Sequence, residues 1–106
     1  MVTIRYGFSD AENRSFIKAT GHAGNDMLCN SVTSILECLA ANLLCIKGTK
    51  TERKDQSGNY TLKWISERPI SNLAAAFALT GIIALAKEYP DMIRVIDPDQ
   101  KEGSEC

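Results

Sequence analysis

The chain has 106 residues, of which 44% are hydrophobic and 24% are charged. This composition is typical of a globular protein with a core and excludes an intrinsically disordered chain. With 12 Lys and Arg against 13 Asp and Glu, the formal net charge is -1, so the chain as a whole lacks the basic field of a dedicated nucleic-acid-binding protein. We therefore expect one domain over residues 1–106 and no direct contact with nucleic acid.

Membrane-spanning segments, secretory signals and cysteine spacing indicate the compartment in which the protein is expected. The sequence shows no run of about 20 apolar residues, the length of a bilayer-spanning helix, and residues 1–5 lack the apolar core of a secretory signal. The cysteines stand at positions 29, 38, 45 and 106, a spacing that fits neither a zinc site nor a redox pair. We expect a cytoplasmic protein with free thiols, no metal, no cofactor and no contact with a membrane.

The first 20 residues have the pattern of a strand hairpin. Apolar side chains occupy every second position over residues 2–8, which is typical of a half-buried strand. Residues 9–13 are polar and favour a turn, and residues 15–20 are expected to form a strand that returns beside the first.

The periodicity then becomes helical. Over residues 28–46 apolar side chains recur three and four positions apart, which predicts an amphipathic helix that ends at Gly48. Residues 49–54 and 59–66 predict a second pair of strands around turn residues 55–58.

A second helix and a last strand complete the chain. Pro69 ends the preceding strand, Ser71 is the expected N-cap of the helix, and the helix stops before Pro90. Residues 92–96 predict a short strand, and the polar tail at residues 98–106 is expected to fray.

The order ββαββαβ predicts an α+β fold with a mostly antiparallel sheet packed against two helices. Tyr60 and Trp64, two of the alternating residues of the fourth strand, are expected in the core or a dimer interface rather than in a base-stacking platform.

Candidate chemistry gathers in the loop before the first helix. If Asp26 is the N-cap, Cys29 lies in the first turn, near free backbone N–H groups and the positive end of the helix dipole, where a thiolate is favoured. Glycines at positions 21 and 24 let the chain reverse, so that the sole histidine, His22, reaches back over that turn. Cys29 would then attack a carbonyl carbon with His22 as general base, and the helix N–H groups would stabilise the oxyanion.

Plainer interpretations apply to the same residues. A lone cysteine near a helix start is commonly a small buried hydrophobe, and a lone histidine is commonly a hydrogen-bonded surface group. Capping alone explains an aspartate at position 26.

These residues resemble the motif of the ribosomal-processing cysteine proteases, a bacterial family of about this length. The motif has Gly-His-Ala, a glycine-containing loop, then Asp, two aliphatic residues and Cys opening a helix, followed by Val and a hydroxyl residue. The matching residues here are Gly21, His22, Ala23, Gly24, Asp26, Met27, Leu28, Cys29, Val32 and Thr33. The resemblance extends to the order of elements over most of the chain.

The resemblance implies an endopeptidase that removes a short N-terminal extension from a large-subunit ribosomal protein, cutting after a pair of aromatic residues. It implies no metal or cofactor and a homodimer. Cys29 would be the nucleophile and His22 the general base, with Asp26 and Thr33 in supporting positions; Thr33 stands where the family usually has Ser.

Two departures bear on the substrate. Only six residues separate His22 from Cys29, where the family usually has a longer loop that closes over substrate, and Asn30 and Ser31 replace two small residues. Another protein precursor, such as a phage structural protein, is therefore an alternative substrate.

Other features carry competing hypotheses. Cys38 and Cys45 are expected to fill the core, and Cys106 is expected to be exposed and without a role. The basic residues 47–54 fit a solvated strand edge or, alternatively, a ribosome-facing patch of a non-catalytic ribosome- or RNA-associated adaptor. A redox thiol protein is a third hypothesis, although no resolving cysteine lies near Cys29 in the sequence.

Overall fold

The computed structural model describes residues 1–9, 14–56 and 58–97 of the chain. The elements are β1 (Val2–Ser9), β2 (Arg14–Thr20), α1 (Asp26–Leu44), β3 (Thr49–Gln56), β4 (Asn59–Ser66), α2 (Pro69–Glu88) and β5 (Ile93–Ile96). This order confirms the α+β fold and the ββαββαβ sequence of elements. The expectations for the tail at 98–106 and for Cys106 concern residues outside those described.

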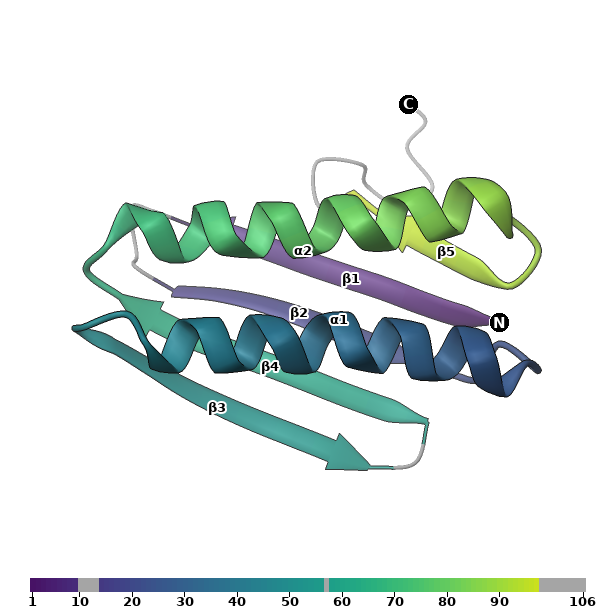
Figure 1. Cartoon of the computed structure of the whole chain (residues 1–106), viewed down its shortest axis with the longest axis horizontal. Helices are drawn as coiled ribbons and strands as arrows, with labels where there is room; N and C mark the ends of the chain where they lie inside the picture. Colours follow the sequence, from purple (N-terminus) through teal and green to yellow (C-terminus); the bar gives the residue numbers. More distant parts are fainter. Residues whose placement is uncertain (10–13, 57, 98–106) are drawn as a thin grey trace.

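The strands form one sheet in the order β3-β4-β2-β1-β5 (Figure 1). All neighbours are antiparallel except β1 and β5, which run parallel, so the sheet is mostly antiparallel as the sequence predicts. β4 returns to pair with β2, and therefore the two hairpins of the chain join along their inner strands.

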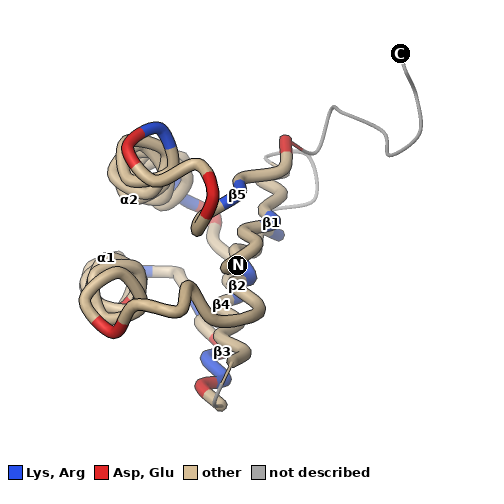
Figure 2. Tube along the Cα trace, turned by 90° about the vertical axis from the view of Figure 1, so that its right-hand side faces the viewer, with Lys and Arg blue, Asp and Glu red and all other residues tan. Residues whose placement is uncertain are grey.

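Both helices cover the same face of the sheet, and the other face has no covering layer in the described part of the chain (Figure 2). The alternation of the strands decides which side chains enter the space below the helices. Ile4, Ile17 and Leu62 are fully buried there, and Trp64 and Tyr60 join them, which confirms the core interpretation of the two aromatic residues.

The two helix starts differ from the expected ones. Asn25, not Asp26, is the N-cap of α1, and its side-chain oxygen accepts hydrogen bonds from two backbone N–H groups of the first turn. α2 begins at Pro69, with Arg68 as N-cap. Proline suits a first helical position because that position needs no N–H donor, so Ser71 lies inside the helix and its hydroxyl donates to the Arg68 carbonyl at 2.8 Å.

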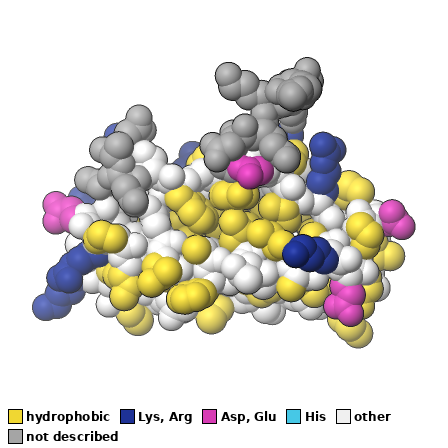
Figure 3. Space-filling model, turned by 90° about the horizontal axis from the view of Figure 1, so that it is seen from above, with side chains coloured by type: hydrophobic (Ala, Val, Ile, Leu, Met, Phe, Trp, Pro, Cys, Tyr) yellow, Lys and Arg dark blue, Asp and Glu magenta, His cyan; other side chains and the backbone are white. Residues whose placement is uncertain are grey.

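The helices differ in what they bury. α1 places its apolar stripe in the core, whereas α2 buries small and medium side chains and exposes several large apolar ones (Figure 3). The large apolar residues that are exposed on α2 are Ile70, Leu73 and Phe77, and Phe77 is 71% exposed.

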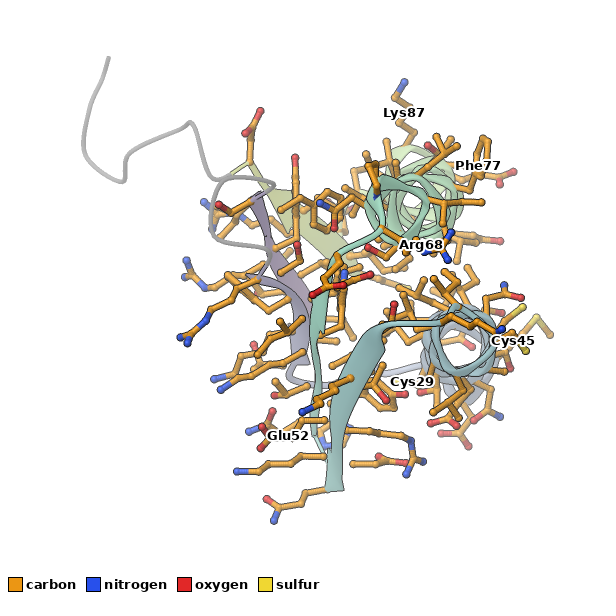
Figure 4. The ribbon with its side chains drawn as sticks, turned by 90° about the vertical axis from the view of Figure 1, so that its left-hand side faces the viewer. Cys29, Cys45, Glu52, Arg68, Phe77 and Lys87 are labelled. Atoms are coloured by element: carbon orange, nitrogen blue, oxygen red, sulfur yellow. The ribbon has the colours of Figure 1, made fainter. Side chains whose placement is uncertain are left out.

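Cys38 and Cys45 are exposed, so the expectation that they fill the core is wrong. The two residues are seven apart and share a side of α1, but that side faces away from the sheet, as Figure 4 shows for Cys45. The core stripe of α1 passes through Leu36, Leu39 and Leu43 instead.

By length and composition alone, α1 and α2 are both long and apolar enough to cross a membrane, contrary to the expectation that no such segment exists. Core helices of soluble proteins meet the same criterion, and both of these helices pack on the sheet.

Candidate active site

A small pocket of about 220 Å³ lies where the loop after β2, the start of α1 and the β3–β4 hairpin meet. Cys29, His22 and Thr33, three of the four site residues expected from the sequence, line it. The fold thus brings the Cys29 thiol and the imidazole of the sole histidine to the same cavity.

Cys29 is partly buried on the side of α1 that faces the sheet (Figure 4). The backbone N–H of Ala23 donates to the Cys29 Sγ at 3.3 Å. A thiolate accepts such a bond more strongly than a thiol does, because it carries the charge. The loop that holds His22 is therefore tied directly to the sulfur.

Three of the backbone N–H groups at the start of α1, which are expected to stabilise the oxyanion, already have acceptors within the helix start. The Met27 and Leu28 N–H groups donate to the Asn25 Oδ1 at 2.9 and 3.3 Å, and the Cys29 N–H donates to the Asn25 carbonyl at 3.1 Å. The cap is Asn25 and not Asp26, and its side chain satisfies two of these three donors.

His22 is exposed at the rim, and its backbone is held on two sides. The Gly21 N–H donates to the Gly58 carbonyl at 2.9 Å, and the Met1 nitrogen donates to the His22 carbonyl at 2.6 Å. Gly21 has a φ of 91°, and a Cβ at this position would collide with the Met1 carbonyl oxygen, so only glycine fits.

The imidazole itself lies against the β3–β4 turn. A Cβ at Gly58 would stand 2.8 Å from the His22 Nε2, so the absence of a side chain at position 58 makes room for the ring. The position of the imidazole therefore depends on a hairpin more than 30 residues away along the chain.

The two supporting residues differ in position. Thr33 lies one turn after Cys29 on α1 and lines the pocket. Asp26 is exposed at the first position of α1 and is outside the pocket lining. Its supporting role stays a prediction, whereas its role as the N-cap is wrong.

The β3–β4 hairpin contributes residues that the sequence predicted as turn or strand but not as part of the site. Asp55, Gln56, Asn59 and Tyr60 line the pocket beside the cysteine and the histidine. Asp55 places a carboxylate there, and its Oδ2 also accepts from the Arg53 Nη2 at 3.3 Å. Local spacing carries no signal for these residues, because strand pairing alone brings them to α1.

Tyr60 is the buried member of this group, 5% exposed, and its hydroxyl lies beside the Glu37 carboxylate and the Arg53 guanidinium. Burial raises the pKa of the Tyr60 hydroxyl to about 12, and the neighbouring Glu37 carboxylate adds to the rise. Glu37 forms an ion pair with Arg53 at 2.6 Å, and the Arg53 guanidinium lies 5.6 Å from the centre of the Tyr60 ring.

Within the described ranges, the His, Cys, Asp and Glu side chains do not gather in groups of three or more that would offer a ligand set for a metal ion. The chemistry available at the pocket is therefore that of a thiol, an imidazole, a hydroxyl and a carboxylate.

Comparison with solved structures relates this arrangement to known proteins. The ribosomal processing protease Prp from S. aureus, in complex with a covalently linked product peptide, matches 90% of this chain and 97% of its own chain, with a TM-score of 0.75 and 16% identity. The chain has the fold of a ribosomal processing protease.

Two further structures support this likeness. Prp from S. aureus in complex with a substrate peptide covers 91% of this chain and 98% of its own, with a TM-score of 0.76 and 14% identity. The protein SMU.848 from Streptococcus mutans covers 90% and 91%, with a TM-score of 0.68 and 19% identity. No protein-family model matches the sequence, and neither does any curated protein.

Proposed function

We propose that this protein is a cysteine endopeptidase in which Cys29 is the nucleophile and His22 the general base. The observation that carries the proposal is that these two side chains line one pocket in a chain with the fold of Prp. The family resemblance of the segment from Gly21 to Cys29 agrees with it.

The reaction needs two steps at this pocket. The Cys29 sulfur forms a bond to the scissile carbonyl carbon while its proton passes to the His22 imidazole, which then protonates the leaving amine as the C–N bond breaks. Water, deprotonated by the imidazole, hydrolyses the thioester and releases the sulfur with its proton. The oxyanion donors would come from outside the capped first turn of α1, since those N–H groups are engaged.

The substrate class is a peptide segment of a protein precursor. The solved Prp structures hold a substrate peptide and a product peptide. For this chain the substrate is the N-terminal extension of a ribosomal protein or another precursor, such as a phage structural protein. Because the segment between His22 and Cys29 is shorter than is usual in the family, both kinds of precursor should be tested as substrates.

Cleavage assays that compare variants of two cysteines, one at the pocket and one outside it, test the mechanism. The probes are synthetic peptides that span an N-terminal extension ending in two aromatic residues and, separately, precursor termini encoded near this gene. We expect Cys29→Ser to lower kcat/KM by at least about 1000-fold, and Cys38→Ser, a matched exposed cysteine on the same helix, to leave it unchanged. Full cleavage by a folded Cys29→Ala variant would overturn the proposal.

The remaining expectations belong to the same proposal. A cytoplasmic location and a homodimer are properties that the resemblance and the composition favour. The competing non-catalytic adaptor would bind a ribosomal component equally well with and without Cys29, and it would cleave no peptide.

A further inference from the structure

The face of the sheet opposite the helices carries a concentration of positive charge that the net charge of -1 conceals. Strand alternation sends one set of side chains to the core and the other set to this face. Five basic residues line its groove: Arg14, Lys18, Lys50, Lys54 and Lys63. The acidic residue in the same lining is Glu52, which lies on this face in Figure 4 and stands 3.9 Å from the Lys54 Nζ.

The groove is long enough for an extended polymer. Two hollows of about 750 and 600 Å³ adjoin along a row of three side chains that line both of them, Phe16, Glu52 and Lys63. They follow β2, β3 and β4 along their length, which for strands of seven or eight residues is roughly 20 Å. This span suits a single strand of about four nucleotides, the low end of the site sizes of domains that bind single-stranded nucleic acid.

An aromatic ring lies in the middle of the basic groove. Phe16 is 39% exposed on β2, a central strand, and its neighbours across the sheet are Lys63 on β4 and Gly7 on β1. A Cβ at Gly7 would stand 2.7 Å from the Phe16 Cε1, so the glycine lets the ring lie across β1. An exposed ring flanked by lysines is suited to stack on an unpaired base while the lysines meet the phosphates.

One end of the groove adds uncharged polar side chains to the lysines, with Thr61 between Lys54 and Lys18 across the sheet. Gln56, Asn59 and Thr61 line it, and the Thr61 hydroxyl contacts the Asn59 Oδ1 at 3.4 Å. Amide and hydroxyl groups of this kind hydrogen-bond to the 2′-hydroxyl, which distinguishes RNA from DNA.

We propose that this open sheet face is a binding surface for single-stranded RNA. Charge complementarity, the extended groove and the central ring together select a polyanion with exposed bases. The groove shares Gln56 and Asn59 with the proposed catalytic pocket, but its five basic residues and Phe16 lie outside that pocket. Binding therefore does not depend on the peptidase proposal and survives replacement of Cys29.

Fluorescence anisotropy with a labelled oligouridylate of about ten nucleotides tests the proposal on the full chain. We expect binding that weakens as salt rises, because phosphate contacts release counterions. The matched oligodeoxyuridylate, which lacks only the 2′-hydroxyls, should bind about threefold or more weakly. Equal affinity for the two oligonucleotides overturns the assignment to RNA, and binding to anionic phospholipid vesicles without binding to oligouridylate assigns the face to a membrane instead.

Charge reversals locate the site. Lys63→Glu should weaken binding about fivefold or more and lower the slope of log affinity against log salt by about one. Lys87→Glu makes the same change of charge on α2, on the helical side of the molecule in Figure 4, and should leave binding within about twofold. Equal losses in the two variants mean that only net charge matters, which overturns the proposed site.

Replacements of Phe16 test stacking apart from charge. Phe16→Leu should weaken binding about tenfold, whereas Phe16→Tyr, which keeps an aromatic face, should bind like the wild type. Circular dichroism verifies that each variant is folded. Unchanged binding by a folded Phe16→Leu variant excludes the ring from the site and overturns the stacking geometry.

Discussion

Each candidate catalytic side chain owes its position to a particular neighbour. Cys29 is held by an N–H from the loop, and the His22 ring occupies the space left by a missing side chain at Gly58. The sequence motif identified both residues, because their types and order are local information. It placed the helix cap one residue late, at Asp26, whereas the Asn25 side chain accepts from the N–H groups of Met27 and Leu28.

Thiol reactivity separates the cysteines. If Cys29 is the nucleophile paired with His22, its alkylation by iodoacetamide should remain fast below pH 8, where an ordinary thiol slows about tenfold for each pH unit. Cys38 and Cys45, both exposed, provide internal references in the same sample. Mass spectrometry of peptides from a pH series measures all three rates. Slower alkylation of Cys29 than of both references at every pH contradicts the nucleophile assignment.

Tyr60 gives the folded chain a response to alkaline pH. Its pKa is raised from 10.0 to about 12, so the folded state retains a proton that the unfolded chain releases. The associated stability is complete below pH 10 and is lost as the pH rises through 12. We expect Tyr60→Phe to show a smaller fall in the free energy of unfolding over that interval, measured by urea titration.

Tyr89 supplies the control for this measurement, because its side chain is 40% exposed. Tyr89→Phe should keep the wild-type fall between pH 10 and 12. If Tyr60→Phe and the wild type decline equally, the burial of this hydroxyl does not govern alkaline stability.

At the scale of elements, Asn72 links α2 to the sheet by hydrogen bonds, in addition to the apolar packing of the helix. The Asn72 Oδ1 accepts from the Trp64 Nε1 at 3.1 Å and from the Ser15 hydroxyl at 2.8 Å, so one amide oxygen joins α2, β4 and β2. Trp64 is 2% exposed, and water has little access to its N–H. Polar groups buried in this way cost free energy when they lose their partner.

Asn72→Ala should lower the free energy of unfolding by about 2 kcal/mol, because it leaves the Trp64 N–H and the Ser15 hydroxyl short of an acceptor. The midpoint of urea unfolding measures the loss, provided that the slope is unchanged. Asn42→Ala, an exposed asparagine on α1, is the matched control and should change stability by less than about 0.5 kcal/mol. Similar midpoints for the two variants would show that the Asn72 bonds contribute no net stability.

At the scale of the whole molecule, the helical layer and the sheet expose different kinds of side chain. The helical side exposes apolar side chains on α2 (Figure 3), and the open face of the sheet carries lysines and an arginine. Like charges disfavour the sheet face as a contact between two copies of this chain, whereas the apolar side of α2 has no such penalty. The homodimer expected from the resemblance would therefore bury α2.

Sedimentation equilibrium tests that arrangement. We expect a dimer for the wild type and a monomer for Phe77→Glu, because a charge at a 71% exposed apolar position would be buried without a partner in the dimer. Leu44→Glu alters a similarly exposed residue on α1, 73% exposed, and should leave the dimer intact. A monomeric wild type at all concentrations would exclude the homodimer.

The sequence alone determined the elements and their order, because alternation and helical periodicity are written in neighbouring residues. It also supplied Cys29 and His22 as candidates. Tertiary structure decided what depends on distant pairing: the hairpin residues beside Cys29, the exposed sides of both helices and the charge of the open sheet face. Composition averages charge over the chain, whereas strand pairing sorts alternate residues onto opposite faces, and only this sorting creates a basic surface on a protein of net charge -1.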